Sequence, residues 1–533
     1  MATLGRKSVL IFGNSIVGAL FGFVAIHYVA VYLGKGVIGQ VDGALAALGI
    51  LFFVTDLGFP MAHTKRVSEG ADPGDCLATF TVFKLVATAA FALVTTLIVV
   101  YATFINPAQF QDYSPVVLIF VGAYLAAKSF AGIPQANFDA RLEAARSQLV
   151  TFTESMTRIA FTILFAWLYA AVVSRDGPLA GLVSSAPGFV GEWLVRHPAE
   201  SLAIAYMLGG VASAFAAFRY VRTARDFGRF RWDILKSYWQ FALPLFIVGT
   251  VGVVGAKIDA VALTLFGSDV NTGTFTGLRR ITLFVETLPV AVALMLFPTV
   301  SALAAAGDKQ GAVDTTRRAL RYTSMVVFPA VVFVIVFAKP IISLVLSNAW
   351  LDEAIVLQVL AIYSLLFAMS RPLSALLTGI NRPDVAARAA IAMSVTLIVF
   401  NLLLIPSDIK SLNIQLFGLY ALGAAISTAL SGLVGYILYF YASSRLAGLH
   451  HPPEILKHLV AALGMAAALW LLAESVVGLE RWYHLLFFGM IGGAVYLALL
   501  WVLKEFRDEE FRFFLNLAHP GQMLRYVRGE LKR

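Results

Sequence analysis

The chain has 533 residues, of which 59% are hydrophobic and only 13% are charged, and its mean hydropathy is +0.82. A water-soluble domain has about a quarter of its residues charged, so this composition leaves too little polar surface for a protein in water. Because one helical span needs about 20 apolar residues, we predict an integral membrane protein without a large soluble domain. The single cysteine, Cys76, excludes an intramolecular disulfide and a cysteine-based metal cluster.

The first apolar run follows Arg6 and Lys7 and is too long for the core of a signal peptide, so we expect an uncleaved first span. The apolar runs do not alternate as the strands of a membrane barrel would, which leaves helices as the spanning elements. We therefore predict an all-α polytopic membrane protein of about fourteen transmembrane helices. In chain order the predicted spans are 9–33, 38–63, 77–103, 115–135, 149–173, 199–221, 237–266, 274–302, 320–346, 354–378, 386–405, 416–442, 458–478 and 484–503.

Five parts follow from this order of spans. The prediction is an N-terminal six-helix lobe at 1–221, a basic interfacial linker at 222–236, a C-terminal six-helix lobe at 237–442, helices 13 and 14 at 443–503, and a basic amphipathic tail at 504–533. The linker and the tail interleave arginines with aromatic residues, which is typical of segments that lie on anionic lipid headgroups. We accordingly expect membrane lipids, and no nucleic acid, as partners of these basic segments.

The distribution of basic residues predicts the orientation. Most Lys and Arg residues lie in the terminal segments and in the loops after even-numbered spans, which places the N- and C-termini in the cytoplasm of a multi-pass protein of the cell membrane. The longest external loop, from Ser174 to Pro198, is too short for an external catalytic domain.

One offset recurs between the two halves of the chain. Gly39 and Gly277, Pro60 and Pro298, and Pro134 and Pro372 are each 238 residues apart, and each pair falls at equivalent places in spans 2 and 8 or 4 and 10. A constant offset indicates an internal duplication. Six spans return the chain to its starting side, so spans 1–6 and 7–12 would be parallel repeats, an arrangement found in transporters that bind substrate between the halves.

Several short motifs carry a resemblance to a known family. They are Gly36-x-x-Gly39 and Leu57-Gly58 in span 2, Phe241-Ala-Leu-Pro244 and Lys257-Ile-Asp259 in span 7, Gly277-Leu-Arg-Arg-Ile and Leu296-Phe-Pro298-Thr-Val-Ser301 in span 8, and Leu377-Thr-Gly379-Ile-Asn-Arg382 after span 10. With fourteen spans arranged as six, six and two, the chain resembles the polysaccharide flippases. These are the Wzx-like members of the multidrug/oligosaccharidyl-lipid/polysaccharide exporter superfamily.

The resemblance implies a flippase that moves an oligosaccharide linked to a polyprenyl (dolichol or undecaprenyl) phosphate from the cytoplasmic to the external leaflet by alternating access. Its product would serve a surface glycan or the glycan of a glycoprotein, and enzymes of glycan assembly would be its protein partners. A charged headgroup cannot cross hydrocarbon unaided, so the protein must provide a wet cavity with cationic side chains. We expect a monomer, because two fused halves already enclose a pathway, and no cofactor beyond coupling to H+ or Na+.

Ionisable residues inside spans are costly unless they are paired or face water, so each is a functional candidate. We expect phosphate or sugar-acid contacts from five basic residues and a coupling or structural role for three acidic ones. The basic candidates are Arg279, Arg280, Lys257, Arg158 and Arg371, and the acidic candidates are Asp56, Asp259 and Glu286. Lys84, Lys128 and Lys339 lie near span ends, where we expect their side chains to extend to the interface.

Helical spacing relates some of these candidates. Arg279 and Glu286 are seven residues apart and share one helical stripe, although Arg279 and Arg280 are also close enough to the start of span 8 to extend to the interface. Glu154 and Arg158 have the i, i+4 spacing of an intrahelical ion pair.

Two other functions share the expected fold, and enzymes are disfavoured. The alternatives are a cation-coupled multidrug exporter of the same superfamily and a peptidoglycan lipid flippase. The sequence has no GxxxxGK[ST], HExxH or GxSxG motif, so we predict a transporter rather than an enzyme.

Overall fold

The structure is a computed structural model that describes residues 18–505 except for 19, 54, 57, 106–113, 142, 174–187, 220–227, 410–413 and 476–480. The chain divides into two compact units, Met1–Thr276 (unit 1) and Gly277–Lys532 (unit 2). The predicted lobe boundaries at 221 and 237 stay predictions. The two units divide at Gly277 because the helix Trp232–Phe266 (α10) packs with three helices of unit 1, α2 (Gly34–Phe53), α3 (Phe59–Ser68) and α4 (Pro73–Val100).

Unit 1 consists of helices in its described part. A π-helical turn, η1, covers Val29–Leu33, and a second, η2, covers Tyr101–Ile105. The α-helices are α2 (Gly34–Phe53), α3 (Phe59–Ser68), α4 (Pro73–Val100), α5 (Pro115–Ala140), α6 (Ala144–Val173), α8 (Gly188–Arg196), α9 (Pro198–Arg219) and α10 (Trp232–Phe266).

Unit 2 repeats the helical character and adds one small hairpin, in which Asp408–Ile409 (β1) pairs antiparallel with Ile414–Gln415 (β2). A short 3-10 helix, η5, covers Asn348–Glu353. The α-helices are α11 (Asp269–Ala305, whose first turns belong to unit 1), α12 (Lys309–Val336), α13 (Ala338–Val345), α14 (Ala354–Gly379), α15 (Pro383–Leu404), α16 (Tyr420–Ala447), α17 (Glu454–Ser475) and α18 (Trp482–Val502).

Twelve helical segments of the described chain are long and apolar enough to cross a membrane, which confirms a polytopic helical membrane protein. The predicted count of fourteen is close but is not confirmed. Predicted spans 1 and 2 form one segment, Leu20–Phe53, that is interrupted at Gly34. The predicted eighth span lies in α11, which is 37 residues long, and among the described residues Leu296–Ala305 of α11 is a shorter apolar helical segment.

The second predicted span is broken. Instead of one helix over 38–63, α2 ends at Phe53, and α3 begins at Phe59 after a turn. Gly58 has a φ of +78°, in the left-handed region that glycine adopts without strain, and Pro60 is placed in the first turn of α3. This turn carries Asp56, so the candidate carboxylate lies at a helix break and not on a helical face.

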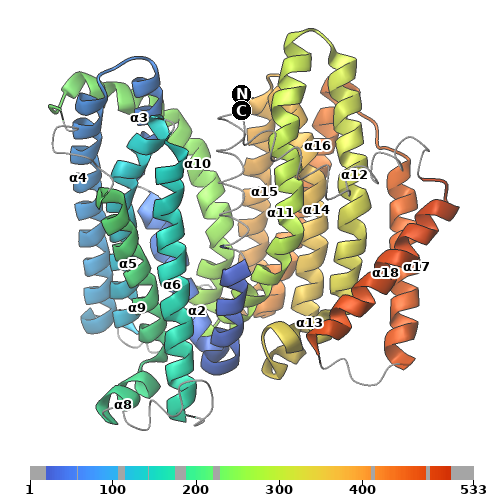
Figure 1. Ribbon diagram of the computed structural model, residues 1–533, viewed down its shortest axis with the longest axis horizontal. Helices are drawn as coiled ribbons and strands as arrows, with labels where there is room; N and C mark the ends of the chain where they lie inside the picture. The colour runs from blue at the N-terminus through green and yellow to red at the C-terminus, as the bar shows by residue number, and fades with distance from the viewer. Residues whose placement is uncertain are drawn as a thin grey trace, which may run out of the picture. The chain divides into compact units, whose positions relative to one another are not determined.

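Within unit 1, α9 packs along both α5 and α6, and Figure 1 shows the three helices side by side. Two adjacent glycines of α9 make this close packing possible. A Cβ at Gly209 would lie 2.8 Å from the Cβ of Arg158, and a Cβ at Gly210 would lie 2.9 Å from the ring of Tyr124. Small residues at helix crossings are a common means of packing helices in membranes, where hydrophobic burial contributes little.

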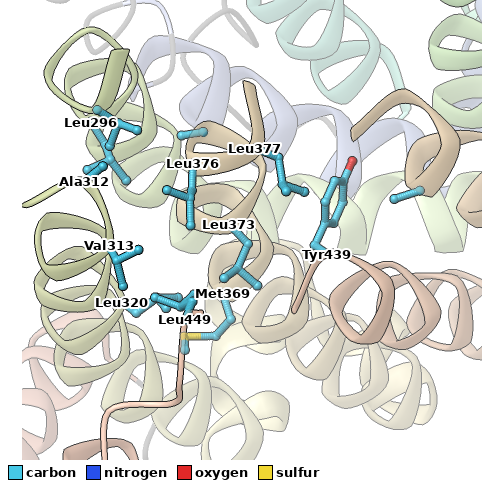
Figure 2. Packing of buried hydrophobic residues seen from close by; sticks show 13 residues of the cluster. Leu296, Ala312, Val313, Leu320, Met369, Leu373, Leu376, Leu377, Tyr439 and Leu449 are labelled. Carbon is cyan, nitrogen blue, oxygen red and sulfur yellow. The ribbon is translucent and has the colours of Figure 1, made fainter. Parts of the chain in front are cut away.

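Within unit 2, α14 packs against α12 and α16, and α16 also packs against α15. Their shared core is apolar, as Figure 2 shows, with Leu373 and Leu376 of α14 fully buried between Leu320 of α12 and Tyr439 of α16.

Helices α17 and α18, which lie outside the predicted repeat, pack against each other and against α12. A buried ion cluster holds the end of α18 in place. Arg321 of α12 donates from Nε to Glu505 Oε1 at 2.6 Å, and His458 Nε2 of α17 lies 3.3 Å from the same oxygen. Lys457 Nζ lies 3.5 Å from Glu505 Oε2.

Most of the two predicted interfacial segments lies outside the described residues, which leave out 220–227 of the linker region and 506–533 of the tail. The described end of the linker is fixed to the start of α4. The backbone N–H of Arg229 donates to Asp75 Oδ1 at 2.8 Å, and that of Arg231 donates to Thr79 Oγ1 at 3.0 Å.

Candidate functional site

In unit 1, Arg158 and Glu154 form the intrahelical pair that their spacing predicts. Arg158 donates from Nε to Glu154 Oε1 at 2.8 Å, and its guanidinium carbon lies 5.0 Å from the ring centroid of Tyr206 on α9. Tyr124 of α5 donates its hydroxyl hydrogen to the same carboxylate oxygen at 3.3 Å. Three helices therefore orient one guanidinium group whose side chain is 26% exposed.

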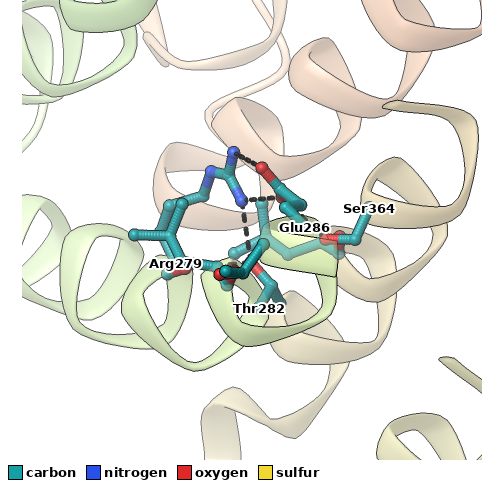
Figure 3. Close-up of polar contacts among 7 residues, drawn as sticks. Arg279, Thr282, Glu286 and Ser364 are labelled. Carbon is teal, nitrogen blue, oxygen red and sulfur yellow. Dashed lines mark hydrogen bonds and ion pairs between the residues drawn. The ribbon is translucent and has the colours of Figure 1, made fainter. Parts of the chain in front are cut away.

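In unit 2, Arg279 and Glu286 of α11 form an ion pair along the stripe that their spacing predicts. Figure 3 shows Nη1 of Arg279 on Glu286 Oε1 and Nη2 on Oε2, the latter at 3.0 Å. Nη1 also donates to Thr282 Oγ1 at 2.8 Å, and Ser364 of α14 donates to Glu286 Oε1 at 2.8 Å. The ring of Tyr363 lies beneath the guanidinium group, with its centroid 4.8 Å from the guanidinium carbon.

The two clusters are built from the same chemical parts. Each has an arginine paired with a carboxylate, a tyrosine ring against the guanidinium group, and a hydroxyl that donates to the carboxylate. The two hydroxyl donors lie on α5 and α14, which carry Pro134 and Pro372, one of the pairs of the predicted repeat. Cation–π contacts and charge-assisted hydrogen bonds orient an arginine without removing its charge, which is what recognition of a phosphate requires.

The three further basic candidates are Lys257, Arg280 and Arg371. The side chain of Lys257 on α10 packs against Gly49 of α2. A Cβ at Gly49 would lie 3.7 Å from Nζ of Lys257. The guanidinium carbon of Arg371 lies 3.9 Å from the ring centroid of Phe367, one turn earlier on α14. Arg280 is half-buried on α11. Contact of these three residues with substrate stays a prediction.

The acidic candidates differ in surroundings. Asp259 is buried on α10, and Glu286 is buried in the Arg279 cluster. Asp56 pairs with Lys84 of α4, whose side chain is only 2% exposed. The expectation that Lys84 extends to the interface is therefore wrong, because the break in span 2 brings a carboxylate to its ammonium group. Within the described residues no group of three or more His, Cys, Asp or Glu side chains is arranged to hold a metal ion.

The sequence did not single out the cluster members Tyr124, Tyr206, Thr282, Tyr363 and Ser364, and it did not predict the pairing of Lys84 with Asp56. Ser364 and Glu286 are 78 residues apart, and Lys84 and Asp56 are 28 apart on different helices, so no spacing rule joins them. An indirect signal existed for the tyrosines, since a polar aromatic residue inside a span needs a partner for its hydroxyl group or its ring.

A helical bundle that crosses the membrane many times and holds paired arginines within its helices has the features of a membrane transporter. The chain belongs to the lipid II flippase MurJ family, whose family model matches residues 145–491, more than half of its length. This membership confirms the flippase that the resemblance implied, and with it a transporter rather than an enzyme. The multidrug alternative is not favoured.

One relative and two solved structures are also similar to this chain. The chain is 24% identical over 519 residues to the probable low-salt glycan biosynthesis flippase Agl15 of Haloferax volcanii, and the alignment covers 97% of this chain and 99% of that protein. Its fold is similar to an inward closed conformation of the lipid II flippase MurJ, with a TM-score of 0.68 and 14% identity over 93% of this chain and 99% of that one. An inward-facing multidrug resistance MATE family transporter of the MOP superfamily gives a TM-score of 0.59, with 15% identity over 83% of this chain and 98% of that one.

Proposed function

We propose that this protein moves a polyprenyl-phosphate-linked oligosaccharide from the cytoplasmic to the external leaflet by alternating access. The observation that carries the proposal is that each unit holds an arginine inside its helices, oriented by a carboxylate and a tyrosine ring. Because a guanidinium group donates two parallel hydrogen bonds, it matches the oxygens of a phosphate or pyrophosphate headgroup.

The extent of the two comparisons supports a glycan precursor as the cargo. Agl15 is named as a flippase of glycan biosynthesis and aligns with almost the whole of this chain, whereas the lipid II flippase family matches residues 145–491. The two cargoes share a lipid diphosphate or phosphate and differ in their sugars. The arginines therefore contact the phosphate or diphosphate that both cargoes share, and other residues of the transport pathway contact the sugars.

The finer predictions belong to this proposal. The substrate contacts are Arg158, Lys257, Arg279, Arg280 and Arg371, and coupling to H+ or Na+ is assigned to Asp56, Asp259 and Glu286. A carboxylate that loses its partner inside the membrane requires a compensating cation or proton, which makes these residues suitable for coupling. The termini face the cytoplasm because the basic loops lie on that side. The protein acts as a monomer beside the enzymes of glycan assembly.

The experiment compares lipid-linked oligosaccharides and surface glycans by mass spectrometry in cells that lack the gene and cells that carry it. We expect precursor to accumulate and surface glycan to disappear, and the mass of the precursor identifies the cargo. Alanine variants of the five basic residues should fail to restore export at unchanged amounts of membrane protein. Unchanged export in all five variants would contradict the site assignment, and altered drug tolerance with a normal glycan profile would contradict the function.

A further inference from the structure

The arginine of unit 2 is engaged at the edge that a phosphate would use. Both terminal nitrogens of Arg279 contact the carboxylate of Glu286, which is the bidentate geometry by which arginine also binds phosphate. The two terminal nitrogens cannot bind two anions in this bidentate geometry at the same time. The structure therefore shows a carboxylate of the protein in the place of the expected ligand.

The guanidinium group has supports that do not depend on Glu286. Thr282 accepts a hydrogen bond from Nη1, and the Tyr363 ring lies 4.8 Å below the guanidinium carbon. These contacts would hold the group in place after Glu286 moved away. The side chain of Arg279 is 21% exposed, whereas that of Glu286 is only 6% exposed.

The arginine of unit 1 provides a contrast within the same chain. Glu154 binds Arg158 only through Nε, and among the described residues the terminal nitrogens of Arg158 have no hydrogen-bond partner. The two terminal nitrogens of Arg158 are thus uncovered by the described residues, although Arg158 also lies against a carboxylate and a tyrosine ring. Glu154 therefore orients Arg158 through Nε, whereas Glu286 covers both terminal nitrogens of Arg279.

We infer that Glu286 is a built-in competitor for the anion site of Arg279, and that a diphosphate or phosphate headgroup binds there by replacing the Glu286 carboxylate on the two terminal nitrogens. This inference rests on the proposed function, which it deepens by assigning the step that controls headgroup binding and release. When Glu286 returns to Arg279, it displaces the headgroup, so the same residue limits affinity and promotes release.

The matched variants are Glu286→Gln and Glu154→Gln, which remove the negative charge and keep the shape. We would measure binding of farnesyl diphosphate to the purified full-length protein in detergent by titration calorimetry, with inorganic pyrophosphate as a second ligand. A carboxylate displaced from a charged pair competes more strongly than an amide, so Glu286→Gln should bind at least about tenfold more tightly. Glu154→Gln should show no gain, because Glu154 does not cover the terminal nitrogens of Arg158.

A second variant keeps the test decisive if Glu286→Gln does not fold. Ser364→Ala removes the hydroxyl that holds Glu286 in place and should give a smaller gain in the same direction. The double variant Arg279→Ala/Glu286→Gln should lose the gain. A gain for farnesyl diphosphate alone assigns the site to a lipid headgroup, and an equal gain for pyrophosphate assigns it to the diphosphate group itself.

Two outcomes separate this inference from the proposed function. If Glu286→Gln binds no more tightly than the wild type while Arg279→Ala loses binding, the exchange is wrong and the phosphate contact stands. If Arg158→Ala and Arg279→Ala both bind as the wild type does, the proposed phosphate site itself is wrong.

Discussion

The burial of the Lys84 charge depends on an ion pair with Asp56. The ammonium group of Lys84 is buried on α4, whereas Asp56 is 40% exposed. Because the two partners differ so much in exposure, their loss should have unequal effects. Removing the carboxylate leaves a buried positive charge, whereas removing the lysine leaves a carboxylate that water still reaches.

We therefore expect Asp56→Asn to destabilise the protein by about 3 kcal/mol, a value typical of breaking a buried pair from one side. Lys84→Met should cost less, and the double variant Lys84→Met/Asp56→Asn should recover much of the loss. Thermal unfolding of the purified protein, followed by intrinsic fluorescence, measures all three. Equal losses in the two single variants and no recovery in the double variant would show that the pair is not the source of the effect.

At the scale of elements, α17 and α18 are attached to α12 by an ion cluster. Glu505 is 2% exposed and is contacted by Arg321, Lys457 and His458. These contacts join three helices at a single carboxylate. The last two helices would accordingly be held to unit 2 by charge as well as by packing.

Glu505→Ala should loosen α17 and α18, because it leaves Arg321 buried without its carboxylate, at a cost of about 3–5 kcal/mol. Hydrogen–deuterium exchange should become faster in residues 454–502 and stay unchanged in α5 and α9. Asp384→Ala is the matched control, since Asp384 pairs with Arg382 and Arg388 on the surface, where such pairs contribute little. Similar exchange in the two variants would contradict an anchoring role for Glu505.

The elements also show how far the sequence could be interpreted. Hydropathy locates the spans because lipid requires long apolar helices, and helical spacing finds the pairs Glu154–Arg158 and Arg279–Glu286 because both partners share a helix. Neither hydropathy nor helical spacing could predict the helix break before Gly58, which depends on the turn between α2 and α3. They also could not predict the Glu505 cluster, whose partners Arg321 and Glu505 are 184 residues apart.

At the scale of the whole molecule, the two units differ at positions that the predicted repeat would make equivalent. The predicted repeat aligns Pro60 with Pro298, yet Pro60 begins a new helix after a break and Pro298 lies inside the continuous α11. The carboxylate of unit 1 binds its arginine through Nε, and that of unit 2 covers both terminal nitrogens of its own arginine. A transporter built of unequal halves can bind and release one headgroup in different steps.

The crossing of α2 with the start of α11 is a place where movement can be tested. A Cβ at Gly39 would overlap the carbonyl oxygen of Asp269 and lie 2.8 Å from the nitrogen of Gly273. The two backbones thus touch, which only glycine permits here. One turn away, a Cβ at Gly36 would lie 4.0 Å from Cγ2 of Val270, so side chains at these two positions are in van der Waals contact and paired cysteines there can be tested for a cross-link.

If alternating access opens this crossing, the double variant Gly36→Cys/Val270→Cys should stop glycan export when oxidised and regain it on reduction. Cys76 is the chain's only cysteine and is buried, so a Cys76→Ser background makes the added pair the sole source of a cross-link. Export is measured by surface glycan in cells that lack the wild-type gene, and each single cysteine variant, treated with the same oxidant, serves as control. Full export by a completely cross-linked protein would show that α2 and the start of α11 stay together throughout transport, and the movement would then have to take place at other helices.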